Sequence, residues 1–152
     1  MNFLLAYLPD EYLKQMARYY ADAKVPFEHP APPSASAAVL QLGKDLVTNG
    51  NPAKQIPACT ACHGENLTGR EPGIPSLIGM RADYISAQLG AWRYGTRTAL
   101  EPDCMQLVAA RLTETEVSAV SAWLSSMPIP ANTQPAKQSS ARLPLGCGSQ
   151  KQ

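Results

Sequence analysis

The stretch Cys59-Thr60-Ala61-Cys62-His63, CTACH in one-letter code, decides how the rest of the chain is interpreted. Two cysteines separated by two residues can each form a thioether bond to one edge of a porphyrin, and a histidine directly after them is placed to ligate the iron. The stretch therefore predicts one covalently attached haem c, with Cys59 and Cys62 as attachment points and His63 as an axial ligand.

A pair of cysteines at this spacing also occurs in zinc sites, in redox-active dithiols and as unrelated buried thiols. A zinc site needs two further Cys or His ligands at paired spacing, but Cys104, Cys147 and His29 are scattered along the chain. A thioredoxin-like dithiol follows a strand, whereas residues 50–57, GNPAKQIP, indicate a turn-rich loop. Haem attachment is the interpretation we favour.

The chain has 152 residues, which is enough for one domain of ordinary size and some additional residues. A formal net charge of +1 provides no basic footprint for nucleic acid, so no nucleic-acid partner is expected. Fourteen prolines beside only two Phe and two Trp indicate a small core with long irregular connections. Such a core suits a fold whose centre is filled by a large cofactor.

Apolar residues at helical spacing predict an all-α domain over residues 36–129. Its first helix begins after Ser36, a favourable N-cap, and ends near Thr48. Gly43 lies in the apolar stripe of that helix, where its missing side chain lets another helix, and an aromatic residue on it, approach closely. Further helices are expected over residues 82–94 and from Thr113, which forms a capping box with Glu116, to just before Pro128.

Residues 1–25 repeat the pattern found at the end of this domain. A shift of 104 positions aligns apolar, acidic and aromatic residues without a gap, including Leu8 with Leu112, Asp10 with Glu114 and Tyr19 with Trp123. Two unrelated amphipathic helices can also align by chance, but the continuity of this match favours a true repeat. We interpret residues 1–25 as the terminal helix of a preceding domain, 26–35 as a Pro-rich linker and 130–152 as an irregular tail.

The N-terminal residues do not form a signal peptide, because no basic region precedes the short apolar run and Asp10 and Glu11 follow it. No stretch approaches the length of a membrane span. Thioether attachment takes place outside the cytoplasm in bacteria. We therefore expect a periplasmic protein whose export signal is not present in the sequence given.

The order of these elements resembles that of the class I cytochromes c, and in detail the C-terminal half of bacterial two-haem cytochromes built from tandem domains. About 90 residues carry the resemblance: Ile56 to Gly64, Ile74 to Gly79, Tyr84 to Leu89, Trp92, Arg93, Gly95, Arg97, and Met105 to Trp123. The resemblance implies helices packed around one haem, preceded here by an extra N-terminal helix. The chain departs from the tandem pattern because the first domain has no CxxCH of its own.

The second axial ligand must be a methionine or be absent, because the domain contains no second suitable histidine. Met105 occupies the loop between helices that holds this ligand in the resembled family, whereas Met80 follows the stretch that lies on the histidine side. We therefore expect Met105 to bind the iron. The resemblance also implies that the Pro75 carbonyl accepts the imidazole proton of His63.

Four further residues are candidates to bind the haem propionates: Trp92, Arg93, Tyr94 and Arg97. For the two arginines, a solvated surface position is an equally good interpretation.

Cys104 and Cys147 remain after the haem motif has been assigned. In an oxidising compartment, two leftover thiols are often joined as a disulfide, which here would tie the tail to the methionine loop. The alternative is a disordered tail with a free Cys147.

Three functions fit the sequence. The first is an electron carrier, with no catalytic residues of its own, between a dehydrogenase or quinol-oxidising complex and a terminal oxidase or reductase. The second is a weak peroxidase or gas-binding protein, if Met105 dissociates easily. The third is a haem subunit or docking module of a larger oxidoreductase complex.

Overall fold

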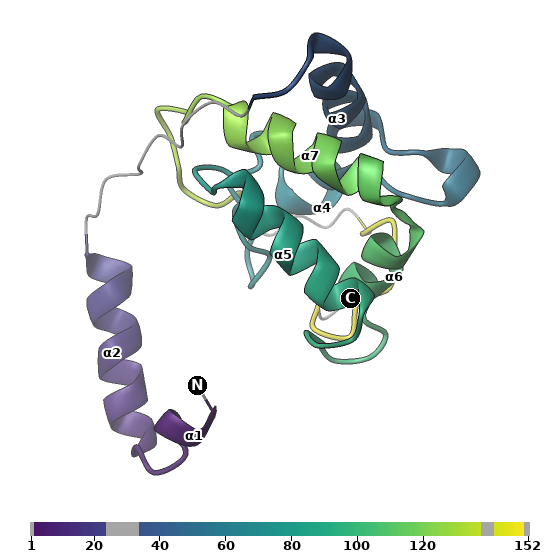
Figure 1. Cartoon of the computed structure of the whole chain (residues 1–152). Helices are drawn as coiled ribbons and strands as arrows, with labels where there is room; N and C mark the ends of the chain where they lie inside the picture. The colour runs from purple at the N-terminus through teal and green to yellow at the C-terminus, as the bar shows by residue number, and fades with distance from the viewer. Residues whose placement is uncertain (1, 24–33, 138–141, 151–152) are drawn as a thin grey trace.

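The computed structural model describes residues 2–23, 34–137 and 142–150. The predicted linker over 26–35 lies outside these ranges except for its last two residues, and so does Met1. The described helices are α1 (Asn2–Leu5), α2 (Asp10–Asp22), α3 (Ala37–Asn49), the short 3₁₀ helix η1 (Pro52–Lys54), α4 (Cys59–His63), α5 (Ala82–Arg93), α6 (Cys104–Arg111) and α7 (Glu114–Ser126), as Figure 1 shows. The described part contains isolated β-bridges but no strand, which confirms the prediction of an all-α fold.

The most extensive packing between helices of the domain is that of α3 against α7 (Figure 1). Gly43 of α3 lies directly against α7, so that a Cβ atom added there would be 2.1 Å from the carbonyl oxygen of Ala119 and 2.8 Å from the Cβ atom of Trp123. The predicted close approach of a second helix, and of an aromatic residue on it, is therefore confirmed. A glycine is required because any side chain would push the two backbones apart.

Side-chain caps set the starts of α3 and α7. The hydroxyl of Ser36 accepts a hydrogen bond from the backbone N–H of Val39 at 3.3 Å. At α7, the Thr113 hydroxyl accepts from the N–H of Glu116, while the Glu116 carboxylate accepts from the N–H of Thr113 at 2.8 Å. Both predicted helix starts are confirmed, because these caps satisfy backbone donors that have no partner within the helix.

Met105 does not lie in a loop, which corrects our expectation. It lies in the first turn of α6, an eight-residue helix that begins after Asp103. The Asp103 side chain caps this helix, and Val108, Ala109 and Leu112 anchor it in the core. The signal was present in the sequence as an N-cap residue followed by apolar residues at helical spacing.

The core lies between α3, α5, α6 and α7, with α5 packed against both α6 and α7. Its buried apolar side chains are Leu46, Val47, Ile56, Leu67, Ile78, Ile85, Leu89, Val108, Ala109, Leu112, Val120 and Leu124. Several residues of the predicted haem site, including Cys59, Trp92 and Met105, are partly buried against this cluster. The site is thus an extension of the core rather than a surface feature.

The tail after α7 has no helix among its described residues, as predicted, but it is attached to the domain at two places. Ala136 exchanges backbone hydrogen bonds with the loop after α4, donating to Gly69 at 2.9 Å and accepting from Glu71 at 2.8 Å. Further along, the N–H of Gly148 donates to the carbonyl of Pro102 at 3.0 Å. The tail therefore contacts both the segment that follows His63 and the segment that precedes Met105.

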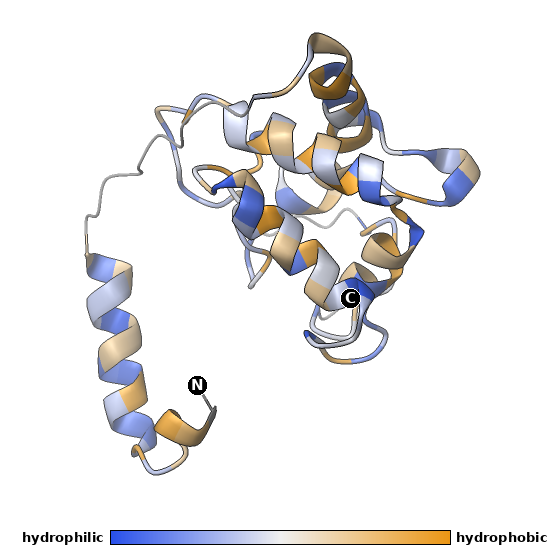
Figure 2. Ribbon diagram, viewed as in Figure 1, coloured by the Kyte–Doolittle hydropathy of each residue, from blue (hydrophilic) through white to orange (hydrophobic). Residues whose placement is uncertain are grey.

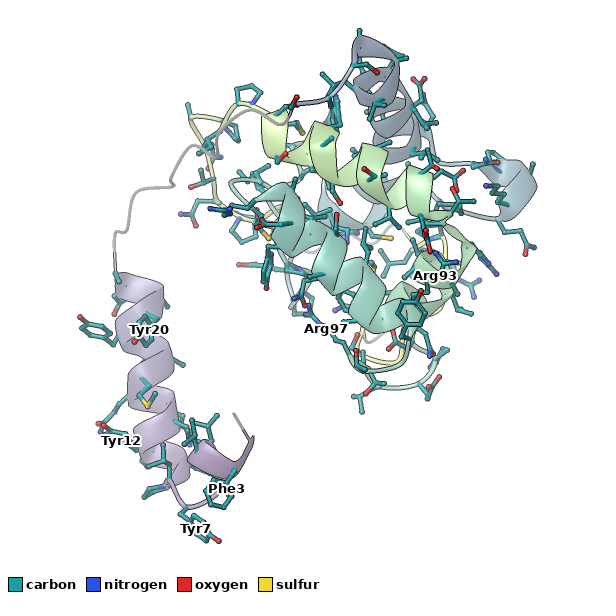
Figure 3. The ribbon with its side chains drawn as sticks, viewed as in Figure 1. Phe3, Tyr7, Tyr12, Tyr20, Arg93 and Arg97 are labelled. Atoms are coloured by element: carbon teal, nitrogen blue, oxygen red, sulfur yellow. A yellow bond between two sulfur atoms is a disulfide. The ribbon has the colours of Figure 1, made fainter. Side chains whose placement is uncertain are left out.

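The predicted N-terminal helix is present as α2, but none of its residues is buried. Figure 2 shows hydrophilic and hydrophobic residues along its whole length. Figure 3 shows the aromatic side chains of Phe3 on α1, Tyr7 in the turn between α1 and α2, and Tyr12 and Tyr20 on α2. These four side chains are 51–85% exposed. Within the described ranges, no helix has both the length and the apolar character needed to cross a membrane.

Candidate functional site

The CTACH stretch forms the five-residue helix α4, which packs against α3. Its approach is fixed by a hydrogen-bonded turn between Asn51 and Ile56, the latter only 3% exposed. The helix ends at Gly64, which has a φ of +86°, a conformation that glycine adopts without steric cost. Because residues three and four apart share one face of a helix, Cys59, Cys62 and His63 lie on the same side of α4.

His63 is buried, with 6% of its surface exposed. Its Nδ1 atom lies 2.8 Å from the carbonyl oxygen of Pro75, and since a proline carbonyl can only accept a hydrogen bond, Nδ1 carries the proton. Burial lowers the pKa of His63, and the hydrogen bond to Pro75 opposes this only in part. The imidazole is therefore neutral at pH 7 and keeps a free lone pair on Nε2, the form that binds metal ions.

The loop after α4 holds the Pro75 carbonyl in this position. The N–H of Gly69 donates to the carbonyl of His63 at 2.9 Å, and the N–H of Leu77 donates to that of Leu67 at 2.8 Å. Leu67 is 1% exposed, so it anchors the loop in the core. The hydrogen bond between His63 and Pro75 is therefore part of a loop that is packed against the core.

The Cys59 and Cys62 thiols form no disulfide. Burial, reinforced by the neighbouring Cys62, raises the pKa of the Cys59 thiol to about 12. Burial also raises the pKa of Cys62, although the charge of Arg70 opposes it. Reactive dithiols have lowered pKa values, so these thiols do not fit a redox-active pair.

The described residues also do not form a zinc site. Among them, no group of three His, Cys, Asp or Glu side chains is arranged to hold a metal ion. Two cysteines and one histidine directly after them, with no fourth ligand, instead match the donor set of a covalently attached haem.

Trp92 supplies a second indication that this site binds a group with an acceptor. Its Nε1 atom is buried and has no hydrogen-bond partner among the described residues, although a buried indole N–H normally has one. The guanidinium of Arg97 lies 3.9 Å from the centre of the Trp92 ring and also donates to the side chain of Gln88. An acidic group bound beside Trp92 would satisfy the orphaned donor, as a haem propionate can.

The other two propionate candidates are placed differently. Arg93 donates to the carbonyl of Leu112 at 3.1 Å and thereby joins the end of α5 to the end of α6, while Tyr94 is 74% exposed. Figure 3 labels Arg93 and Arg97. The structure thus brings Trp92 and Arg97 together, whereas Arg93 serves a contact between helices.

The two candidate methionines come from different elements. Met80 lies five residues after Pro75, the partner of His63, and just before α5, whereas Met105 lies on α6, which packs against α5. Both side chains are partly buried against the core. One residue beside Met105 was missed by sequence reasoning: Asp103, a buried carboxylate that accepts hydrogen bonds from the backbone around Met105.

Cys104, the residue before Met105, is joined to Cys147 by a disulfide, with the two Cα atoms 5.1 Å apart. The tail is therefore covalently attached to the first turn of the helix that carries Met105.

Comparison with known proteins identifies relatives of this chain. A thiosulfate dehydrogenase electron acceptor from Thiomonas intermedia is 38% identical over 127 residues, which are 84% of this chain and 56% of that protein. Cytochrome c4 from Pseudomonas aeruginosa is 33% identical over 129 residues, 84% of this chain and 62% of the relative. The chain thus spans 56–62% of the length of these two relatives.

Solved structures agree with this relationship. Reduced cytochrome c4 from Pseudomonas stutzeri matches with a TM-score of 0.67 at 30% identity, over 82% of this chain and 64% of that one. Thiosulfate dehydrogenase from Marichromatium purpuratum matches with a TM-score of 0.70 at 30% identity, over 80% of this chain but 25% of that one. The predicted resemblance to the bacterial two-haem cytochromes is confirmed by these matches to cytochrome c4.

The family model described as cytochrome c matches residues 40–128, which is more than half of the chain and includes α4, α5, α6 and α7. The chain therefore belongs to the cytochrome c family, whose members carry covalently attached haem c.

Proposed function

We propose that this protein is a periplasmic carrier of single electrons whose haem iron is bound between His63 and Met105. The observation that supports it most strongly is the buried, neutral His63, whose Nδ1 atom donates to Pro75 at 2.8 Å and leaves Nε2 free. A bound haem c supplies a one-electron couple between ferrous and ferric iron. The side chains of this protein would attach the haem, bind its iron and interact with its propionates.

Cys59 and Cys62 would hold the haem covalently, since both thiols are free and lie on the face of α4 that also carries His63. The hydrogen bond to Pro75 fixes the plane of the imidazole and its tautomer, as partners of metal-bound histidines commonly do. In this tautomer the lone pair of His63 Nε2 would be available to the iron.

Met105 would contribute a thioether sulfur, a neutral ligand that favours ferrous iron and raises the reduction potential. With His63 and Met105 both bound to it, the iron would have no position left for a substrate. This is the physical reason for proposing a carrier and not a catalyst.

Trp92 and Arg97 would hold the propionate side. The buried Nε1–H of Trp92 is a donor without a partner among the described residues, and the stacked guanidinium of Arg97 adds positive charge beside the ring. Together they would offset the charge of one propionate within a partly buried site.

The redox partners are proposed from the relatives. Because one relative is named as the electron acceptor of thiosulfate dehydrogenase, we propose a dehydrogenase of this kind as the electron donor. A quinol-oxidising complex is the alternative donor, and a terminal oxidase or reductase is the proposed acceptor.

Residues 1–25 are proposed to be the end of a preceding domain of the same family. α2 spans Asp10–Asp22 and α7 spans Glu114–Ser126, so the two helices have equal length and a shift of 104 at both ends. This match of helix boundaries supports the internal repeat that the side chains suggest.

Spectroscopy of the oxidised protein tests the axial ligands. A far-red charge-transfer band, which reports a methionine sulfur on ferric haem, is expected in the wild type and in Met80→Leu, and it should be lost in Met105→Leu. Met80 is the matched control because it is also a methionine partly buried against the core. A wild-type spectrum without this band, together with rapid binding of external ligands, would contradict the proposal and favour a peroxidase or gas-binding protein.

A further inference from the structure

Asp103 is a buried carboxylate for which the electron carrier described above has no role. Only 3% of its surface is exposed, whereas aspartate is rarely buried unless its oxygens are satisfied by partners. The residue lies at the junction between the irregular segment that follows α5 and the first turn of α6. Its position is two residues before Met105.

Each carboxylate oxygen of Asp103 holds a different part of the backbone. Oδ1 accepts hydrogen bonds from the N–H groups of Met105 and Gln106, both at 3.1 Å. Oδ2 accepts one from the N–H of Ala99 at 2.7 Å. A single side chain therefore links the chain four residues before it to the helical turn that starts after it, and it does so where little water competes.

The N-cap side chains of α3, η1 and α7, which are Ser36, Asn51 and Thr113, each accept only one backbone hydrogen bond. Ser36 at α3 and Thr113 at α7 are hydroxyl caps that act on their own helix, while α2 and α5 begin without a side-chain cap. Asp103 caps with a carboxylate, and an ionised carboxylate accepts stronger hydrogen bonds than a hydroxyl does. It is also bonded to a residue outside the helix, so it fixes the position of α6 relative to the preceding segment.

We infer that Asp103 is a positioning residue for Met105: its carboxylate holds the backbone of the methionine so that the sulfur stays on the iron. The inference rests on the proposed role of Met105 as axial ligand. Asp103 touches neither haem nor substrate and acts through the main chain of Met105. Without it, the first turn of α6 and the segment 99–103 separate more easily, and the sulfur leaves the iron more often.

The test is the rate at which imidazole binds to the oxidised holoprotein, since imidazole can bind only after the methionine has left. Asp103→Ala removes all three acceptor contacts, so imidazole binding should be faster on the order of tenfold or more, as expected for the loss of several hydrogen bonds to a buried carboxylate. Asp103→Asn keeps one acceptor oxygen and should give an intermediate rate. If Asp103→Ala does not fold, the imidazole-binding rate of Asp103→Asn is the measurement that tests the inference.

Ser36→Ala and Thr113→Ala are the matched controls, because each removes a helix cap elsewhere in the domain. Both should lower the midpoint of thermal unfolding, yet they should leave the imidazole rate within about twofold of the wild type. A merely structural role of Asp103 would make its variants behave like these two controls.

The outcomes separate the two proposals. If Met105→Leu retains the far-red band, the proposed ligand is wrong. If Met105→Leu loses the band but both Asp103 variants bind imidazole at the wild-type rate, the ligand stands and the positioning role of Asp103 is overturned.

Discussion

α2 and α7 are helices of the same length and similar pattern, but their surroundings are opposite. α7 buries seven of its residues: Glu116, Ala119, Val120, Ser121, Ala122, Leu124 and Ser125. α2 buries none, and Tyr19, which aligns with Trp123, is 71% exposed. An apolar stripe thus indicates that a helix has a face to bury, but the surface that buries this face must be supplied by another part of the protein.

The difference has two identifiable sources. α7 has the surface of α3 to pack against, including the position at Gly43 where no side chain intervenes. It also begins with a capping box, whereas α2 begins after Pro9 without a side-chain cap. Variants that remove the close packing or the capping box of α7, and a matched variant in α2, test how much each feature contributes to stability.

The largest effect is expected from Gly43→Ala. The new Cβ atom would lie 2.1 Å from the carbonyl oxygen of Ala119, so α3 and α7 must move apart. Overpacking of this kind costs about 3 kcal/mol or more when it involves backbone. Thermal and denaturant unfolding of the holoprotein would measure the loss. Gly90→Ala is the control, because an added Cβ at this helical glycine meets nothing within 4 Å.

A smaller loss is expected from Glu116→Gln. The Glu116 carboxylate accepts from the N–H and hydroxyl of Thr113 and from Lys54, the last at 2.7 Å. The amide keeps the shape of the side chain but loses the charge, which should lower the free energy of unfolding by about 1–2 kcal/mol. Glu114→Gln, in the same first turn but exposed, should change it much less.

The same carboxylate predicts a dependence of stability on pH. Burial acts to raise the pKa of Glu116, but the hydrogen bonds from Lys54 and Thr113 outweigh it and bring the pKa below the ordinary 4.5. A carboxylate with a lowered folded pKa stabilises the protein above its unfolded pKa, and this stabilisation disappears as the pH falls through the folded value.

Unfolding of the wild type and Glu116→Gln, compared between about pH 6 and about pH 3, provides the measurement. The difference in unfolding free energy should shrink towards low pH. A difference that stays constant across this range would show that the charge of Glu116 is not what stabilises α7.

The smallest effect is expected in α2. Tyr19→Ala should change the unfolding free energy of this chain by less than about 0.5 kcal/mol, because the side chain is exposed. Trp123→Ala at the aligned position should cost about 2 kcal/mol or more, since Trp123 packs against the core. Equal losses in the two variants would mean that α2 is packed against the domain after all.

Much of this fold follows from local signals in the sequence. Ser36 and Thr113 start their helices as predicted because capping depends on residues three positions apart. Gly43 predicts the helix crossing because only a glycine accommodates such an approach. The CTACH stretch predicts the location of the site because its chemistry is contained in five consecutive residues.

The remaining features depend on contacts between distant residues. α6 is short, and its cap, Asp103, is held partly by Ala99 across an irregular turn. The tail pairs Ala136 with Gly69 through backbone atoms alone, so no side-chain pattern marks the contact. The stacking of Arg97 on Trp92 likewise depends on how the chain turns after α5.

The disulfide between Cys104 and Cys147 closes a covalent ring of chain that contains the whole of α7. A protease that cuts once within this ring, for example between α7 and Cys147, releases no fragment. The nicked protein would migrate at full mass on a denaturing gel without reductant and separate into two pieces once a thiol is added. Damage to the tail in an oxidising compartment would therefore leave α7 attached to the helix that carries Met105.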